Sequence, residues 1–227
     1  MMLLNVMSSL LISLTLLTGE GTEKTMISSS SDTGWKMVEQ DETLTIFERW
    51  ISLPDGRTTR ERKGVFYTDK PSDDIVPLLS NASGIKGWMH GVEDSRELYA
   101  HRVNDKMVYI LFDVPWPFKN RDMIAEIRTY NNCDNGCAEV FFTAKRNILP
   151  EYSNIVRMHS YEAHWKITPV PNGTSKVSFS AYSETKPVAP RWIQDPVTAK
   201  LFRDNLLNLY ELLAFNTEKD SLETPGK

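Results

Sequence analysis

The sequence predicts an α+β protein: a curved antiparallel sheet of about nine strands wrapped around a long C-terminal helix, with short helices after the third strand. Three observations lead to this fold class. Apolar and polar residues alternate with period 2 over most of residues 35–186, which is typical of strands. Turn sequences separate consecutive runs, so neighbouring strands form antiparallel hairpins. The last apolar run has helical spacing instead.

Three strands precede the short helices, and we expect them over residues 35–40, 43–52 and 58–67. From Pro71 the apolar residues follow helical spacing, and two acids stand where they favour the positive end of a helix. Because Pro77 lies within the first turns, this helix should be short.

Six further strands and one helix complete the domain. The strands are predicted over 91–101, 106–114, 123–131, 138–146, 160–170 and 175–186. A strongly twisted sheet of this size curls. The helix should run from Pro196, at its first position, to about Phe215, with Asp195 as its cap. Its broad apolar face needs an apolar surface, and the concave face of the sheet provides one.

The corner between the fifth and sixth strands is the most unusual stretch of the chain. Pro115 and Pro117 each remove a backbone donor and fix φ, so no regular ladder crosses them. Trp116 lies between the two prolines, and Arg121 and Asp122 open the next strand. We interpret all five residues as a structural corner, in which the charged pair ties the bend into the sheet.

Composition narrows the class of protein. The 227 residues are enough for one sizeable domain, and the formal net charge is -4. A nucleic-acid-binding protein would show a basic excess or a basic stripe, and neither is present. The one basic cluster, Arg57, Arg60, Arg62 and Lys63, is interrupted by Glu61, and we interpret it as the solvated face of a strand.

The N-terminal region predicts export. Residues 1–21 form a signal peptide or, alternatively, an uncleaved membrane anchor, because residues 3–17 are apolar and almost free of charge but short for a membrane span. Residues 22–33, with four consecutive serines, have the composition of a flexible linker. We assign 34–216 to the folded domain and 217–227 to a polar tail, and expect a periplasmic or secreted protein.

The two cysteines, Cys133 and Cys137, flank an Asp-Asn-Gly turn sequence. They should face each other across a hairpin tip, where a disulfide is expected in an exported protein. Free thiols and thiol chemistry are the alternatives. Two thiols without a nearby third ligand make a poor zinc site, so no metal is expected.

The order of these elements resembles the helix-grip fold and, within it, the START domain, the lipid-transfer family related to steroidogenic acute regulatory protein. The resemblance covers residues 34–215 and is carried, in the order of the family, by Gly34-Trp35-Lys36, Trp88, Pro115-Trp116-Pro117 with Asn120-Arg121-Asp122, His164-Trp165-Lys166-Ile167-Thr168-Pro169, and Pro190-Arg191-Trp192-Ile193.

The resemblance implies a cavity between the curved sheet and the last helix that holds one lipid or sterol-like molecule. A gap lined by apolar residues stays dry and accepts an apolar ligand. Alternation does not show which strand face points inward, and each candidate could equally fill a packed core. The candidate lining residues are Tyr109, Leu111, Met123, Ala125, Ile127, Phe179, Ala181, Ser183, Leu206 and Tyr210.

In some family members, a buried arginine paired with an acid meets the polar end of the ligand. That arginine often stands six positions after the arginine of the corner, and here this position is Ile127. Arg128 follows it, and alternation places Arg128 on the opposite face unless a bulge intervenes. The candidates for a polar anchor are therefore Asp94, Asp113, Glu126 and Arg128.

No catalytic motif is present: the chain has no Gly-x-Ser-x-Gly, no His-Glu-x-x-His and no phosphate-binding glycine loop. We expect a monomer that binds or transfers a lipid, makes transient membrane contact and needs no cofactor. Two alternatives stay open. One is a cyclase- or hydrolase-like enzyme acting on a hydrophobic substrate in the same cavity. The other is an interaction module without a ligand.

Overall fold

The computed structural model describes residues 34–114, 116, 119–133, 136–171, 173–184 and 190–222, without the side chains of residues 132, 133, 193 and 216–222. The predicted signal peptide and linker, Pro115 and Pro117 of the corner, the end of the last strand after Glu184, and the end of the polar tail lie outside these residues.

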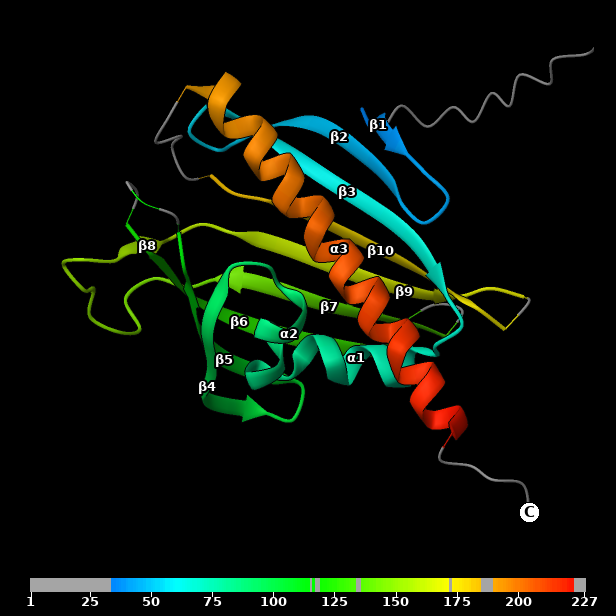
Figure 1. The fold of residues 1–227 in the computed structure, drawn as a ribbon. Coiled ribbons are helices and arrows are strands. Elements are labelled where there is room, and N and C mark those ends of the chain that lie inside the picture. The colour runs from blue at the N-terminus through cyan, green and yellow to red at the C-terminus, as the bar shows by residue number, and fades with distance from the viewer. Residues whose placement is uncertain are drawn as a thin grey trace, which may run out of the picture. The chain divides into compact units, whose positions relative to one another are not determined.

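One ten-stranded sheet forms the body of the described chain (Figure 1). Its strands follow one another in space in the order β1-β2-β3-β10-β9-β7-β6-β5-β4, and every neighbouring pair on this path is antiparallel. The predicted antiparallel sheet is thereby confirmed. The strands are β1 (Lys36–Gln40), β2 (Thr45–Ser52), β3 (Thr58–Thr68), β4 (Val92–Arg102), β5 (Asp105–Phe112), β6 (Arg121–Cys133), β7 (Cys137–Ala144), β8 (Val156–Met158), β9 (Glu162–Pro169) and β10 (Ser175–Tyr182).

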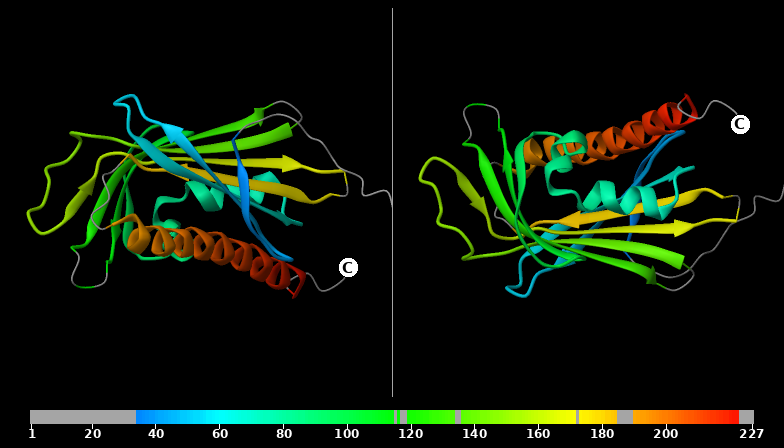
Figure 2. Two further views of the ribbon diagram at one scale, coloured as in Figure 1. Left: turned by 90° about the horizontal axis from the view of Figure 1, so that it is seen from above. Right: turned by 90° about the horizontal axis from the view of Figure 1, so that it is seen from below.

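Three α-helices cover one face of the curved sheet, as the two views of Figure 2 show. The short helices α1 (Ser72–Ser80) and α2 (Ile85–Trp88), with a single 3₁₀ turn between them (Ala82–Gly84), lie between β3 and β4 in the chain. The long helix α3 (Arg191–Leu222) crosses the same face. The predicted helix-grip arrangement is confirmed.

A chain of aromatic contacts joins the sheet to the helices. Trp88 of α2 meets Trp165 of β9 edge to face, with 5.6 Å between ring centroids. Trp165 stacks on Phe179 of β10 at 4.0 Å, and Phe179 stacks on Phe202 of α3 at 5.3 Å. All four side chains are buried. Aromatic pairs of this kind add about 0.5–1.5 kcal/mol each to the stabilisation from burial alone.

Helix α3 packs on β3 through one apolar stripe. Phe202, Leu206, Leu209 and Leu213 are buried and recur every three or four residues, the spacing of one helix face. Gly64 of β3 lies under this stripe, and a Cβ atom there would overlap Cδ1 of Leu206. The helix can therefore come this close to the strand only because residue 64 has no side chain.

Helix α3 is longer than the sequence predicts, because it begins at Arg191 and runs to Leu222. Asp195, the predicted cap, lies inside the helix, and its carboxylate pairs with Arg60 of β3 at 3.1 Å. Pro196 also lies within the helix. Residues 217–222, assigned to the polar tail, extend its last turns.

Strand β8 was not predicted. It pairs in parallel with the start of β6, Val156 opposite Arg121 and Met158 opposite Met123. Arg157 of this strand is 6% exposed, and its guanidinium donates two hydrogen bonds, of 2.6 and 2.9 Å, to the carboxylate of Asp122. The same guanidinium donates to the carbonyls of Leu149 and Pro150. Asp122 thus ties the end of the corner to β8, as a structural role requires.

The pairing of β6 with β7 places Cys133 opposite Cys137. This is the backbone arrangement that the predicted hairpin requires, but the side chain of Cys133 lies outside the described residues, so the disulfide stays a prediction. Within the described part of the chain, no helix is long and apolar enough to cross a membrane.

Candidate functional site

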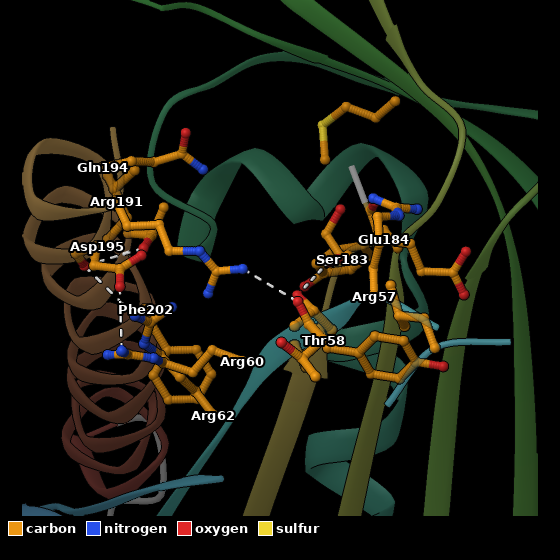
Figure 3. A pocket seen from close by; sticks show the side chains of 18 of the residues that line it. Arg57, Thr58, Arg60, Arg62, Ser183, Glu184, Arg191, Gln194, Asp195 and Phe202 are labelled. Atoms are coloured by element: carbon orange, nitrogen blue, oxygen red, sulfur yellow. Dashed lines mark hydrogen bonds and ion pairs between the residues drawn. The ribbon is translucent and has the colours of Figure 1, made fainter. Parts of the chain in front are cut away.

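A cavity of about 1000 Å³ lies between the sheet and the N-terminal half of α3. Small-molecule sites typically measure about 300–1,000 Å³, so this cavity is at the upper end of the range. Figure 3 shows part of its lining. The lining residues come from the turn before β3 and its first residues, the ends of β8 and β10, the start of β6, and α3.

The inner face of strand β10 explains why the cavity lies at this end of the sheet. Along β10, Val177 and Phe179 are buried, whereas Ala181 and Ser183 follow them toward the cavity and are only partly buried. A small and then a polar side chain cannot fill the space beneath a helix as two large apolar ones do. Helix and sheet interdigitate at one end and leave a gap at the other.

The walls of the gap are largely apolar. Phe179 and Ala181 contribute from β10, Leu201 and Phe202 from α3, and Met158 from β8. Tyr161, which precedes β9, also lines the cavity, and burial raises the pKa of its phenol well above the ordinary value. A neutral phenol and aliphatic side chains suit an apolar ligand.

Two arginines of β3 point into the cavity. Arg60 and Arg62 share the inner face of the strand with Gly64, whereas Lys63 points to the other face, over the rings of Trp35 and Phe47. The expectation that this basic cluster is a solvated strand face is therefore wrong for Arg60 and Arg62. Strand alternation was the signal that could have separated them from Lys63.

Arg60 and Arg62 are held by acids. Glu48 of β2 accepts from Arg60 at 2.9 Å and from Arg62 at 2.8 Å, and Asp195 of α3 pairs with Arg60 at 3.1 Å. Figure 3 shows Arg60, Arg62 and Asp195 beside the first turns of α3. The network connects β2, β3 and α3, so it fixes the helix over this end of the cavity.

Two more arginines lie at the solvent side of the cavity. Arg191 donates to the carbonyl of Thr58 at 3.2 Å, which Figure 3 draws as a contact across the opening. Arg57 bonds its neighbour Asp55 at 2.6 Å and the carbonyl of Glu184 at 2.9 Å. Both arginines therefore bridge segments that border the opening.

Arg121, at the start of β6, also lines the cavity. It is partly buried and makes no ion pair or side-chain hydrogen bond with the residues that the structure describes. Its neighbour Asp122 is on the opposite face of β6, bound to Arg157. Within the part of the chain that the structure describes, Asp122 is therefore the one of these two charged residues that has an ion pair.

The structure divides the predicted lining residues among three places. Phe179, Ala181 and Ser183 line the cavity, and the Ser183 hydroxyl donates to the carbonyl of Ser160 at 2.6 Å. A second group belongs to the packed core between sheet and helices, namely Met123, Ala125, Ile127, Leu206 and Tyr210, the last in edge contact with Phe66.

Tyr109 and Leu111 lie on the other face of the sheet, so the expectation that they line the cavity is corrected. They belong to a small separate cluster with Met107, Ile124 and Leu149. The pairing of Tyr109 with Ile124 puts these two side chains on one face and their neighbours Ile110 and Met123 on the inner face. Burial and the carboxylate of Asp122 raise the pKa of Tyr109 to about 12.

None of the four candidate polar anchors is among the cavity-lining residues that the structure describes. Asp94 pairs with exposed Arg96 at 2.5 Å, and Asp113 is exposed. Glu126 binds Arg128 at 2.7 Å and Lys145 at 2.8 Å. Arg128 directly follows Ile127, which is buried in the core on the inner face of β6. Because successive side chains of a strand point to opposite faces, Arg128 points away from the cavity.

The described residues hold no group of three or more histidine, cysteine, aspartate or glutamate side chains placed to bind a metal ion. The described cavity lining also contains no histidine, the commonest general base. The site offers an apolar wall, several arginines and the phenols of Tyr161 and Tyr182, whose pKa values are both raised by burial.

Comparison with solved structures identifies the architecture. A STAR-related lipid transfer protein from Xanthomonas axonopodis superposes with a TM-score of 0.70 at 22% identity, covering 80% of this chain and 99% of that one. Human STARD10 gives 0.68 at 17% identity, covering 86% and 79%, and human StAR-related lipid transfer protein 5 gives 0.67 at 12%, covering 82% and 89%.

The chain has the START-domain fold. No protein-family model matches the sequence. An uncharacterized protein of Pseudomonas aeruginosa, PA1579, is 24% identical over 161 residues, which cover 70% of this chain and 76% of that protein. The structural likeness to the Xanthomonas axonopodis protein covers 80% of this chain, and the sequence likeness to PA1579 covers 70%.

Proposed function

We propose that this START-fold protein binds a single lipid or sterol-like ligand in the cavity beneath α3, for lipid transfer or sensing. The observation that carries the proposal is the cavity itself, about 1000 Å³ in volume and walled by Phe179, Phe202 and Met158. Two of the similar solved structures, the Xanthomonas axonopodis protein and human StAR-related lipid transfer protein 5, are named as lipid transfer proteins, which supports this class of ligand.

The N-terminal half of α3 is the natural gate. Leu201 is 38% exposed although it lines the cavity, whereas Leu206, Leu209 and Leu213 farther along the helix are buried. Ligand entry would then need movement only of the first turns, which are held by Arg60, Arg62 and Arg191.

Native mass spectrometry of the purified protein tests the proposal. We expect a complex with one hydrophobic molecule per chain, whose mass is unchanged after extraction, and exchange of that molecule with lipid vesicles. Replacement of Ala181 by Trp should fill the cavity and abolish the complex while the protein stays folded. A protein that binds no amphiphile of any class would refute lipid binding, and a ligand chemically altered on binding would favour the enzyme.

We also propose that the protein is exported and that its first 21 residues are removed or serve as an anchor. The support is the apolar, nearly uncharged run over residues 3–17. Cell fractionation followed by mass spectrometry tests this proposal, because it shows the compartment that holds the protein and whether its first 21 residues have been removed. Recovery of the full-length chain from the cytosol would contradict export.

A further inference from the structure

The charges around the cavity are unequal. Among the described lining residues, five arginines (57, 60, 62, 121 and 191) face two acids (Glu184 and Asp195). Two acids that do not line the cavity also pair with these arginines. Asp55 pairs with Arg57, and Glu48 pairs with both Arg60 and Arg62. The arginines without a carboxylate partner in the described chain are Arg121 and Arg191.

Arg191 and Arg121 differ in their surroundings. Arg191 is exposed, donates to the carbonyl of Thr58 and lies over the ring of Trp50 at 4.8 Å. Arg121 is partly buried and has no such contacts in the described residues. A guanidinium withdrawn from water without a partner costs free energy, and an anion that reaches it recovers that cost.

Apolar surface begins directly beside Arg121. Strand β8 pairs with β6 so that Met158 lies opposite Met123, two residues along the strand from Arg121. Met158 lines the cavity, as do Phe179 and Phe202. A cation at one edge of an apolar space matches a molecule with an anionic head and an aliphatic tail.

The deeper part of the same strand offers no charge to a ligand. Ala125 and Ile127 share the inner face of β6 with Arg121, and both are fully buried in the apolar core. Arg128 is on the other face, held by Glu126. The polar end of a ligand therefore has its cationic partner on β6 only at the strand's first residue.

We propose, given the lipid-binding function above, that the ligand is an anionic amphiphile whose carboxylate or phosphate head binds the guanidinium of Arg121, while its tail lies along Met158, Phe179 and Phe202. A guanidinium donates two parallel hydrogen bonds to either kind of head group.

The test compares three amphiphiles that have the same unsaturated hydrocarbon chain: oleic acid, oleoyl lysophosphatidic acid and oleyl alcohol. Their affinities are measured by displacement of a neutral fluorescent probe, N-phenyl-1-naphthylamine, from the full protein at pH 8. We expect the acid, the phosphate or both to bind roughly 10- to 100-fold more tightly than the alcohol, the range for a hydrogen bond to a charged group. The two anions together show which head group the site prefers.

Two substitutions locate the effect. Arg121→Gln should remove the preference for the anion and leave the affinity for oleyl alcohol unchanged, whereas Arg121→Lys should keep part of the preference. Arg128→Gln is the matched control, because Arg128 is on the same strand but opposite in face and paired with Glu126. It should change neither affinity. Circular dichroism establishes that each variant is folded.

The outcomes separate this inference from the proposed function. Equal affinities for acid, phosphate and alcohol, or a preference that survives Arg121→Gln, would overturn the anionic head group but leave lipid binding standing. Displacement of the probe by inorganic phosphate alone at similar concentrations would overturn the amphiphile as ligand. Failure of all three compounds to bind would overturn this inference, and it would overturn the proposed function as well only if native mass spectrometry finds no bound lipid or sterol of any class.

Discussion

The side chains of Arg121 and Asp122 lie on opposite faces of strand β6, and Asp122 forms a buried ion pair with Arg157. Its carboxylate and the guanidinium of Arg157 are 1% and 2% exposed and share two hydrogen bonds. Asp122→Asn should leave an uncompensated buried charge and lower the free energy of unfolding by about 3–5 kcal/mol. Urea denaturation measures the loss.

The exposed pair of Asp94 and Arg96 is the control for that substitution. Its side chains are 46% and 54% exposed, so Asp94→Asn should cost less than about 1 kcal/mol. Equal losses in the two variants would contradict a special role for the buried pair.

His164 gives the domain a predicted pH dependence. It lies on the outer face of β9, stacked on Phe141 at 4.2 Å, and burial lowers its pKa although Glu139 opposes the shift. The unfolded chain therefore binds more protons near pH 6 than the folded one, and this residue makes stability rise with pH between about pH 5 and 7. Urea denaturation across that range should show a shallower rise in His164→Gln, and an unchanged slope would contradict the assignment.

At the scale of residues, the sequence predicted which kinds of side chain line the cavity better than it predicted the face of the sheet to which each one points. The lining candidates on β5 and β6 all had odd numbers, but Tyr109 pairs with Ile124, so facing residues have opposite parity. That register depends on the length and path of the corner, which alternation does not encode. The prediction for Arg60 and Arg62 failed for a related reason. Two arginines on one strand face are expected to lie in solvent unless the acids that pair with them are known.

At the scale of elements, long periodic segments were predicted and short or tertiary-driven ones were not. All nine longer strands and the C-terminal helix were expected. Strand β8 has three residues, too few to show an alternating pattern of apolar and polar side chains. Its pairing with β6 is stabilised by the hydrogen bonds between Arg157 and Asp122. The early start of α3 at Arg191 likewise accompanies contacts with Thr58 and β3 that lie far away in sequence.

The closeness of α3 and β3 depends on Gly64. In Gly64→Ala the new methyl group must displace Leu206, and we expect a loss of about 1–3 kcal/mol in the free energy of unfolding. Gly87→Ala is the control, since a Cβ there meets nothing within 4 Å and Gly87 lies in helix α2. It should be neutral or slightly stabilising. Thermal or urea denaturation compares the two, and equal effects would contradict the close approach.

At the scale of the whole molecule, the order of elements and the ordered landmarks were enough to predict the START fold, because each describes the whole chain rather than one contact. The position of the cavity was not predictable in the same way. It follows from where large side chains give way to Ala181 and Ser183 on β10 beneath α3, which requires register and helix placement together.

Two exposed tryptophans stand close in sequence to arginines that line the cavity, and they predict which part of the molecule contacts a membrane. Trp192 is 77% and Trp116 is 92% exposed, and each stands within five residues of a lining arginine, Arg191 or Arg121. Tryptophan favours the membrane–water interface, and arginine attracts anionic lipids. Trp116→Ser with Trp192→Ser should weaken sedimentation with vesicles of phosphatidylglycerol and phosphatidylcholine about 10-fold or more, without changing ligand affinity.

Phe215→Ser is the matched control for the tryptophans, because Phe215 is 64% exposed near the other end of α3. If the cavity end faces the membrane, this substitution should leave vesicle binding unchanged, since its side chain lies about 35 Å along the helix from Trp192 at 1.5 Å per residue. Equal losses from Phe215→Ser and from the double tryptophan substitution would indicate adhesion without orientation and contradict docking through the opening. Added salt should weaken binding of the unaltered protein, because part of the attraction is between arginines and lipid phosphates.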